Sequence, residues 1–326
     1  MCASIGEDQP HPYYILRLGN VGQCLKFIQL RGVSYLLVGG LKGELWLVST
    51  ATKRPLWTNI THGSGAILYV DEITEGTAIT YGKDQFLCVW SITEERGELI
   101  QSIKQEQYTF CNFTTLLLSE GCCLACMPTS EYSNIRVLKI HSKYTSSSEE
   151  TILKSVGKAK ECTALKVVDR NTDIIVLAAY LEDSLIVWSL TSRTVLFFLE
   201  NLLSDKICTM DFDETRMMGV IGGTEGSLGV FRIKKREGED VLLHDVIDYN
   251  LNSTVSFVRV RRDRKLVTCG TSSGIVYAIS WKTMKPLVQL KYHEESVYQM
   301  DYSVEGSDNI IAVCSKDKRI SLWKLY

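Results

Sequence analysis

A serine in the stretch Gly270-Thr271-Ser272-Ser273-Gly274 fits the pattern G-x-S-x-G, in which serine is the nucleophile of a hydrolase. That chemistry needs a strand before the serine and a helix after it, because the strained turn between them exposes the hydroxyl. Here the apolar residues 275–279 follow the motif and predict a strand instead of a helix. We therefore interpret the five residues as a hairpin turn.

Cysteine and histidine spacings could support metal or redox chemistry. Cys123 and Cys126 have zinc or redox spacing, with Cys111, Cys122 and His141 as the nearest further ligands. A zinc site needs about four ligands, whereas strand alternation points Cys123 and Cys126 to opposite faces, so we interpret both as buried structural thiols. The histidines are His11, His62, His141, His244 and His293. With no histidine cluster and no phosphate-binding glycine loop, we expect no metal, no cofactor and no enzymatic activity.

The strands that carry these residues follow a repeated pattern of an acidic residue, a tight turn and a strand ending in an aromatic residue. In the clearest copies the acidic residue precedes the aromatic residue by six positions. These pairs are Asp84 with Trp90, Glu182 with Trp188, Glu225 with Phe231, and Asp317 with Trp323. Weaker copies place Val48, Leu138 and Ile279 in the aromatic position. A pattern repeated along one chain indicates a repeat architecture.

The spacing of the repeats predicts the fold. The seven aromatic positions lie 42 to 50 residues apart, which matches a four-stranded blade of a β-propeller and resembles the WD-repeat pattern. The sequence therefore predicts an all-β, seven-bladed WD-repeat propeller. His62 and His293 precede Trp90 and Trp323 by 28 and 30 residues, where such repeats carry a Gly-His pair. Because Thr61-His62-Gly63 reverses that order, the sequence permits the usual histidine–hydroxyl–tryptophan network without establishing it.

The two ends of the chain predict how the ring closes. Residues 1–12 are expected to be a disordered tail, and residues 13–326 a single propeller. The stretch 13–18 has strand character but lacks room for three partners before the first full repeat. We expect it to be the outer strand of the last blade, beside residues 319–325. This pairing would remove the open edge of a ring of sheets.

Connections between strands suggest a charged surface on blades five and six. Residues 234–240 follow the third strand of blade five, and residues 261–265 join the first two strands of blade six. Such connections emerge on one face, where the following basic residues should gather: Lys234, Lys235, Arg236, Arg261, Arg262, Arg264 and Lys265. We predict a docking site for an acidic or phosphorylated segment. The alternative is a solvated rim, half-neutralised by Glu237, Glu239, Asp240 and Asp263.

Composition limits the classes of partner. Lys and Arg number 36 and Asp and Glu 38, and the net charge of −2 gives no general attraction to nucleic acid or acidic membranes. No apolar run approaches the roughly 18–20 residues of a membrane span, and residues 1–12 lack the basic start and apolar core of a leader. The 11 cysteines are an odd number. Together these features predict free thiols in a reducing compartment.

Three stretches of the C-terminal half carry a more specific resemblance than the repeat does. The first is Phe212-Asp213 through Gly222 to Phe231, and the second is Trp281-Lys282-Thr283-Met284-Lys285-Pro286-Leu287 followed by His293. The third runs from Ser315 to Tyr326. On these residues the chain resembles the G-protein beta-subunit-like protein 1 family, also called the ASTRA-associated protein 1 family. Blades one to four resemble that family mainly in pattern.

The resemblance implies a non-catalytic adaptor in the cytoplasm and nucleus. Members of the family work with the co-chaperone assembly that stabilises newly made phosphatidylinositol-3-kinase-related kinases, and so affect DNA-damage signalling. Fungal members belong to the ASTRA chromatin-associated complex. The partners implied are this co-chaperone complex and its client kinases, with no direct contact to nucleic acid or membrane.

Other classes of propeller make different demands on the sequence. The G-protein beta subunit pairs a long N-terminal helix with a gamma subunit, whereas residues 1–12 contain Pro10 and Pro12 and no heptads, so we expect no gamma partner and a monomeric propeller. A substrate receptor of a ubiquitin ligase is the alternative adaptor role. An enzyme or small-ligand binder would need a titratable cluster in the central channel, which the sequence does not reveal.

Overall fold

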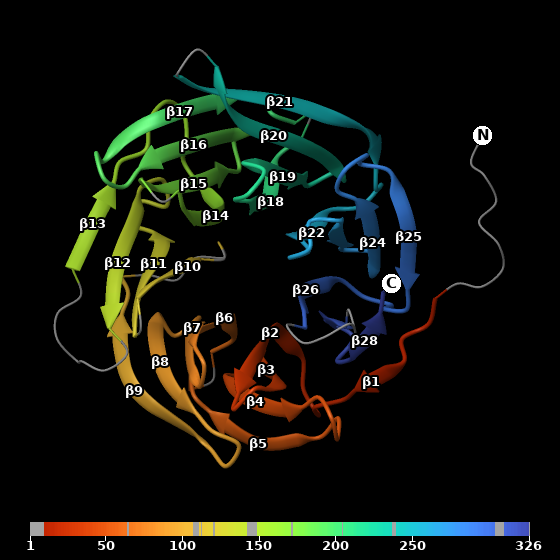
Figure 1. The fold of residues 1–326 in the computed structure, drawn as a ribbon. Helices are drawn as coiled ribbons and strands as arrows, with labels where there is room; N and C mark the ends of the chain where they lie inside the picture. The colour runs from red at the N-terminus through yellow and green to blue at the C-terminus, as the bar shows by residue number, and fades with distance from the viewer. Residues whose placement is uncertain are drawn as a thin grey trace.

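The computed structural model describes residues 10–63, 65–106, 111, 113–119, 121–141, 149–170, 172–203, 205–236, 239–303 and 310–325. These residues form seven four-stranded antiparallel sheets around a central axis, with no helix among them (Figure 1). The predicted seven-bladed, all-β architecture is confirmed. Of the predicted tail, residues 1–9 lie outside the described part of the chain.

Each blade contributes one strand to each of four layers, from the channel to the circumference. The innermost strands are β2 (Gly22–Leu30), β6 (Ile67–Thr74), β10 (Thr114–Ser119), β14 (Cys162–Asp169), β18 (Ile207–Asp213), β22 (Val255–Val260) and β26 (Val297–Tyr302). The second strands are β3 (Val33–Gly40), β7 (Thr77–Gly82), β11 (Cys122–Pro128), β15 (Ile174–Tyr180), β19 (Met218–Gly223), β23 (Leu266–Thr271) and β27 (Ile310–Ser315).

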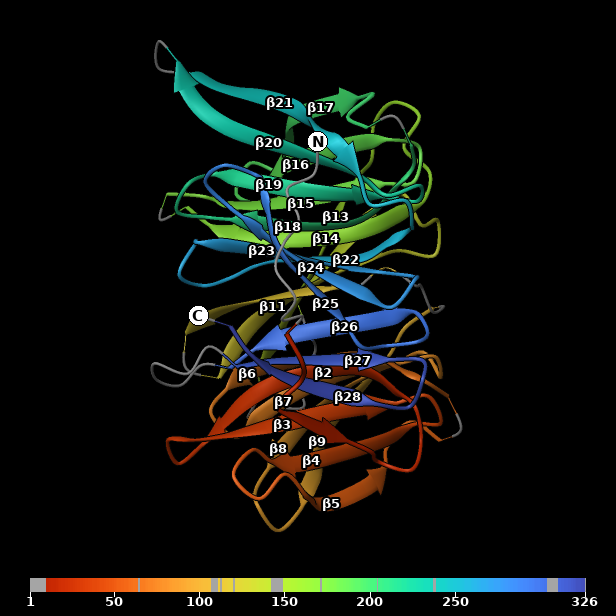
Figure 2. The ribbon, with the colours of Figure 1, turned by 90° about the vertical axis from the view of Figure 1, so that its right-hand side faces the viewer.

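The third strands are β4 (Glu44–Ser49), β8 (Phe86–Ile92), β12 (Ile135–His141), β16 (Ser184–Ser189), β20 (Ser227–Arg236), β24 (Ile275–Ser280) and β28 (Ile320–Lys324). The outermost strands are β5 (Pro55–Ile60), β9 (Gly97–Lys104), β13 (Glu149–Leu153), β17 (Thr194–Glu200), β21 (Glu239–Asn250), β25 (Pro286–Lys291) and β1 (Tyr14–Leu16). Blade one is thus β2–β5, and blade seven is β26–β28 with β1. Figure 2 shows the ring from its side, with the turns on two opposite faces.

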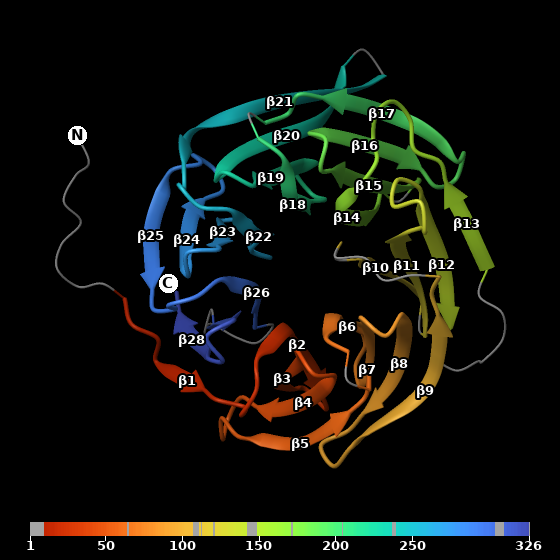
Figure 3. The same ribbon diagram turned by 180° about the vertical axis from the view of Figure 1, so that it is seen from behind.

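The outer strand of blade seven comes from the start of the chain. β1 pairs antiparallel with β28, placing Tyr14 opposite Leu322 and Leu16 opposite Ile320 (Figures 1 and 3). The N–H of Tyr13 also donates to the Leu322 carbonyl at 2.9 Å. Leu16 is buried in the cluster that fills the space between blades seven and one. The predicted pairing of the two ends is therefore present, and blade seven has four strands.

The sequence pattern of each strand follows its layer. Second and third strands lie between two neighbouring blades, so both of their faces are buried; every residue of β16, including Trp188, is buried. The outermost strand β17 instead alternates exposed and half-buried residues. Apolar clusters fill the spaces between adjacent blades, as Tyr180 and Trp188 do between blades three and four. Truncating such an aromatic side chain typically costs about 3–5 kcal/mol, so these clusters hold the ring together.

One expectation about blade five is wrong. Residues 234–236 do not lie in a loop after the third strand but continue β20, which pairs with β21 as far as Arg236 opposite Glu239. The reason is continued alternation, because Ile233 is buried while Arg232 and Lys234 are exposed. Residues 237–238, the side chains of Lys235 and Arg236, and residues 142–148 lie outside what the structure describes.

Candidate functional site

Blade two contains the complete hydrogen-bond network expected at the repeat positions. The ring of buried His62 places Nδ1 2.9 Å from Asp84 Oδ1 and Nε2 2.7 Å from Thr80 Oγ1. Trp90 Nε1 donates to the same hydroxyl at 2.8 Å. The network joins the loop before the blade to its second and third strands. The reversed order around His62 therefore does not prevent it.

Blade seven builds the same network with its hydroxyl on another strand. His293 Nδ1 lies 2.9 Å from Asp317 Oδ2, and Nε2 lies 2.8 Å from Ser321 Oγ. Trp323 Nε1 donates to Ser321 Oγ at 2.7 Å. Ser321 is on the third strand of its blade, whereas Thr80 is on the second. Burial lowers the pKa of His293, although Asp317 opposes this shift, so the ring is held neutral.

In blades four and five, a carboxylate and not a histidine links the segment before the blade to the turn between the second and third strands. Glu182 accepts the N–H groups of residues 160–161 at 3.1 and 3.2 Å. In blade five the roles are reversed, because Asp205 before the blade accepts the N–H of Glu225 at 2.6 Å. The aromatic positions of both blades, Trp188 and Phe231, are buried. All of these repeat positions stabilise blades, which leaves function to other residues.

Charged side chains form a ring around the central channel, which sequence reasoning missed. In six blades a charged residue stands two positions beyond the bulge of the innermost strand. These residues, in chain order, are Lys26, Asp71, Lys166, Asp211, Arg259 and Asp301. Their signs alternate around the channel, except that no member comes from blade three. The sequence signal that could have revealed the ring is the common position of these charged residues in the innermost strand of each repeat.

Ion pairs and backbone hydrogen bonds connect this ring. Lys26 Nζ lies 2.8 Å from Asp71 Oδ1, and Lys166 Nζ lies 2.7 Å from Asp211 Oδ1. Burial alone would raise the pKa of Asp71, but Lys26 holds it well below its usual range. Burial likewise opposes the lowered pKa of Asp211, which Lys166 and Arg259 produce. Because these carboxylates are ionised, positive and negative charge nearly balance inside the channel.

A cavity of about 420 Å³ lies at the mouth of the channel, and residues of the predicted basic turn form part of its wall. Arg261, Arg262 and Arg264 all line this cavity. Arg262 is exposed, as is Lys265 in the same turn. Arg261 is only 5% exposed and donates from Nε and Nη2 to Asp263 at 2.8 and 2.6 Å. Arg261 is therefore a wall of the cavity and not an exposed surface residue.

Asp213 connects two of the sequence stretches that carry the family resemblance. Its Oδ2 accepts the indole N–H of buried Trp281 at 3.0 Å. Its Oδ1 accepts Arg264 Nε at 3.2 Å, which fixes the basic turn. Lys282 and Lys285 follow Trp281 in the turn before β25 and are exposed. Sequence reasoning did not assign these lysines to the basic surface, although their turn emerges on the same face as residues 261–265.

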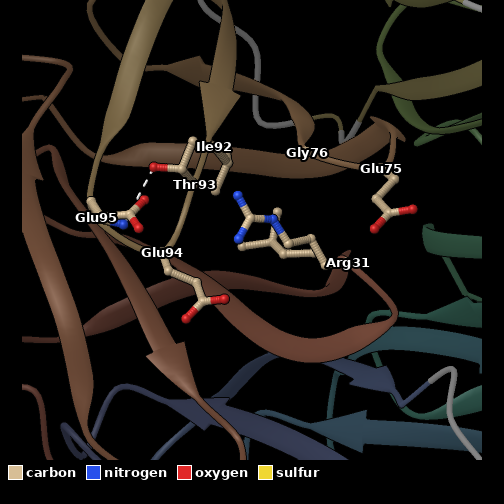
Figure 4. A pocket seen from close by; sticks show the side chains of 8 residues that line it. Arg31, Glu75, Gly76, Ile92, Thr93, Glu94 and Glu95 are labelled. Atoms are coloured by element: carbon tan, nitrogen blue, oxygen red, sulfur yellow. Dashed lines mark hydrogen bonds between the residues drawn. The ribbon is translucent and has the colours of Figure 1, made fainter.

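A second pocket of about 260 Å³ lies between the turns of blades one and two on this same face (Figure 4). Arg31 extends into it, with Glu75, Glu94 and Glu95 around its rim. The turns of blades one and two on this face carry both signs of charge, because Arg31, Lys53, Arg54 and Arg96 occupy the turns of the same two blades as these three glutamates.

The serine and cysteine residues that were considered for catalysis or metal binding lie in a hairpin turn and between blades. Ser272 lies in the turn between β23 and β24, as predicted. Cys123 packs between blades two and three, whereas Cys126 packs between blades three and four, on the opposite face of β11. Within the described residues no group of three or more acidic, cysteine or histidine side chains could hold a metal ion. No helix in that part of the chain is long and apolar enough to cross a membrane.

The fold and the two complete aspartate–histidine–hydroxyl–tryptophan networks define a WD-repeat β-propeller. No protein-family model matches the chain. The β-propeller domain of Cps50 (Swd1) from Myceliophteria thermophila has the same fold, with a TM-score of 0.77, 12% identity, and coverage of 97% of this chain and 100% of that one.

Three curated proteins are similar to the chain in sequence. Guanine nucleotide-binding protein subunit beta-like protein 1 of Mus musculus is 25% identical over 334 residues, which cover 99% of each chain. ASTRA-associated protein 1 of Schizosaccharomyces pombe is 39% identical over 69 residues, and that of Schizosaccharomyces japonicus 36% over 69. Those segments cover 21% of this chain and 18% of each relative. The chain is therefore a WD-repeat propeller that is similar to these proteins, which supports the resemblance seen in its sequence.

Proposed function

We propose that the chain is a non-catalytic adaptor that binds partner proteins through a basic surface on blades five and six. We define this basic surface by its exposed side chains: Lys234, Arg262, Lys265, Lys282 and Lys285. None of them has an ion-pair partner among the described residues, while buried Asp213 and exposed Asp263 are already engaged with arginines. This excess of unpaired positive charge, concentrated on a rigid scaffold, is the observation that supports docking of an acidic segment.

A finer proposal concerns the identity of the partners. The similarity to ASTRA-associated protein 1 supports action with the co-chaperone assembly that stabilises phosphatidylinositol-3-kinase-related kinases, in DNA-damage signalling. In this proposal the chain works in the cytoplasm and nucleus as a monomeric propeller, and client kinases reach it through the co-chaperones. Its contacts are with proteins, without a gamma subunit, a membrane or direct binding to nucleic acid.

Affinity purification followed by mass spectrometry tests both levels. The tagged chain should capture kinase co-chaperones, and the triple variant Arg262→Glu, Lys265→Glu and Lys282→Glu should recover at least about tenfold less of them, because charge reversal repels an acidic partner. The control variant Lys42→Glu, Lys83→Glu and Lys318→Glu reverses exposed charges on the opposite face. Equal capture by both variants would contradict the basic surface. Capture of a cullin adaptor in place of co-chaperones would favour a ubiquitin-ligase receptor.

A further inference from the structure

The cavity at the channel mouth contains hydrogen-bond donors that the protein itself does not satisfy. Arg261 Nη1 is buried and has no acceptor, although the other two nitrogen atoms of this guanidinium bind Asp263. Arg259 and Arg262 line the same cavity. Neither donates a hydrogen bond to a described side chain, although, against the opposing effect of burial, the charges of Asp211 and Asp301 raise the pKa of Arg259. A buried charged donor left without an acceptor is costly, so Arg261, together with the exposed guanidinium of Arg262, is complementary to an anion that enters from outside.

The buried carboxylates that line the cavity accept hydrogen bonds from neighbouring groups of the protein. Asp211 accepts Lys166 Nζ at 2.7 Å and the N–H of Val260 at 2.8 Å. Asp301 accepts the N–H of Phe27 at 2.9 Å, and Asp213 holds Trp281 and Arg264. Glu214 is the one exposed carboxylate among the lining residues that the structure describes. The arginines therefore retain donors for a ligand while the acidic side chains retain few acceptors for a cation.

The geometry points to a phosphoryl group as that ligand. Arginine binds phosphate through parallel N–H groups, and a phosphomonoester offers three acceptor oxygens and nearly two charges where a carboxylate offers two oxygens and one charge. Three arginines within four residues of one chain segment suit the phosphoryl group better. We propose that the channel mouth binds a phosphorylated serine or threonine in an extended segment of a partner protein; this proposal rests on the adaptor function.

The surroundings of the cavity favour a phosphorylated segment over a free polyphosphate. The carboxylates of Asp211 and Asp301 belong to the charged ring and would repel a second phosphoryl group placed deeper in the channel. Outside the cavity the basic surface continues through Lys265 to Lys282 and Lys285, whose turns are joined by the Trp281 N–H to Lys265 carbonyl bond of 2.9 Å. A chain leaving the cavity would thus cross positive charge.

Fluorescence anisotropy with purified protein tests this proposal. The probes are a labelled pool of short random peptides with one central phosphoserine, and the same pool with serine. Wild-type protein should bind the phosphoserine pool at least about tenfold more tightly, and Arg262→Ala should remove about tenfold of that affinity because a hydrogen bond to a charged group is lost. Arg262 is exposed, so the variant should melt at the wild-type temperature. Arg259→Gln is a second variant, for which a loss of affinity for the phosphoserine pool is also expected.

The matched control is Arg54→Ala, which removes an exposed arginine from a turn of blade one on the same face. Equal binding of the two pools, or equal losses in the Arg54 and Arg262 variants, would overturn the proposal. Binding of inositol hexakisphosphate without binding of the phosphoserine pool would overturn it in favour of a soluble polyphosphate. If the charge-reversal variant loses its partners but the pools bind equally, the adaptor function stands and this inference fails. If the phosphoserine pool binds selectively while no partner is captured, the phosphate-binding inference stands and the adaptor function fails.

Discussion

Asp213 shows how one buried carboxylate positions the candidate site. Its side chain is 1% exposed, and it accepts hydrogen bonds from Trp281, from Arg264 and from the N–H groups of residues 215–216. A carboxylate buried this deeply is stable only when its oxygens are filled with donors. Because those donors come from the turns of two blades, Asp213 fixes the wall of the cavity that Arg264 and its neighbours form.

Glu72 on β6 predicts a pH dependence of stability. Burial raises the pKa of this half-buried carboxyl from 4.5 to about 7, although the N–H of Gln29 and the Lys26 charge oppose the shift. Between these values the folded state binds more protons than the unfolded state, so the contribution of Glu72 to stability is present below pH 4.5 and is lost as pH rises through 7. The Glu72→Gln variant keeps a side-chain oxygen that can accept the Gln29 N–H, and it removes the loss of stability that ionisation of Glu72 causes.

The variant should therefore be more stable than wild type by about 1 kcal/mol at pH 8, a value reduced from the full linkage because the carboxyl is partly solvated. The difference should shrink toward zero near pH 4.5. Urea unfolding at both pH values measures it, with Glu200→Gln on an exposed outer strand as the control. A gap that does not change with pH would refute the assignment.

At the scale of the strand, blades two and seven show that the hydroxyl of the histidine network can come from either of two paired strands. Thr80 lies opposite Cys88 in blade two, and Ser321 lies opposite Val313 in blade seven. Ser321→Ala should cost about 1–3 kcal/mol, because it leaves the buried His293 ring and an indole N–H without their shared partner. Adding Val313→Thr to this variant should restore most of the loss, since it places a hydroxyl where blade two has one.

Thermal or urea unfolding of the two variants checks the exchange, and Val313→Thr alone is the control. Restoration by a second hydroxyl would show that the position of the oxygen, and not the identity of the strand, is what the network requires. If the double variant is no more stable than Ser321→Ala, the two blades are not interchangeable in this respect.

The sequence revealed the blades because their pattern lies within single strands. An apolar strand ending at Trp90 or Trp323 can be recognised from its own residues, as can the hairpin turn at Ser272. The charged ring could not be recognised in this way, because Lys26 and Asp71 belong to different blades and their pairing exists only when the sheets stand side by side. For the same reason the basic surface was predicted without its lysines on the neighbouring turn, and buried Arg261 was counted as a surface residue.

On the scale of the whole ring, a net charge of −2 conceals a local excess of positive charge on one face. At blades one and two, Glu75, Glu94 and Glu95 are offset by Arg31, Lys53, Arg54 and Arg96 in turns of the same blades, whereas the basic surface lies across the channel at blades five and six (Figure 1). A local excess of positive charge on a chain of low net charge orients an acidic partner during approach without attracting polyanions in general. It also gives an ionic-strength dependence to docking, because exposed charges are screened over about 8–10 Å at physiological salt.

Ring closure carries the last prediction. β1 supplies three residues to blade seven, yet its loss would leave β28 as an open edge and expose the buried cluster around Leu16. Removing residues 1–18 should therefore lower the melting temperature by about 5 °C or more, since several kcal/mol of burial and hydrogen bonding are lost, and should promote aggregation through the free edge. Removing residues 1–12 keeps the Tyr13 bond to Leu322 and should leave the melting temperature unchanged. Leu16→Asp, which places a charge in the same cluster, should resemble the longer truncation; stability equal to wild type in both would mean that the ring closes without its first strand.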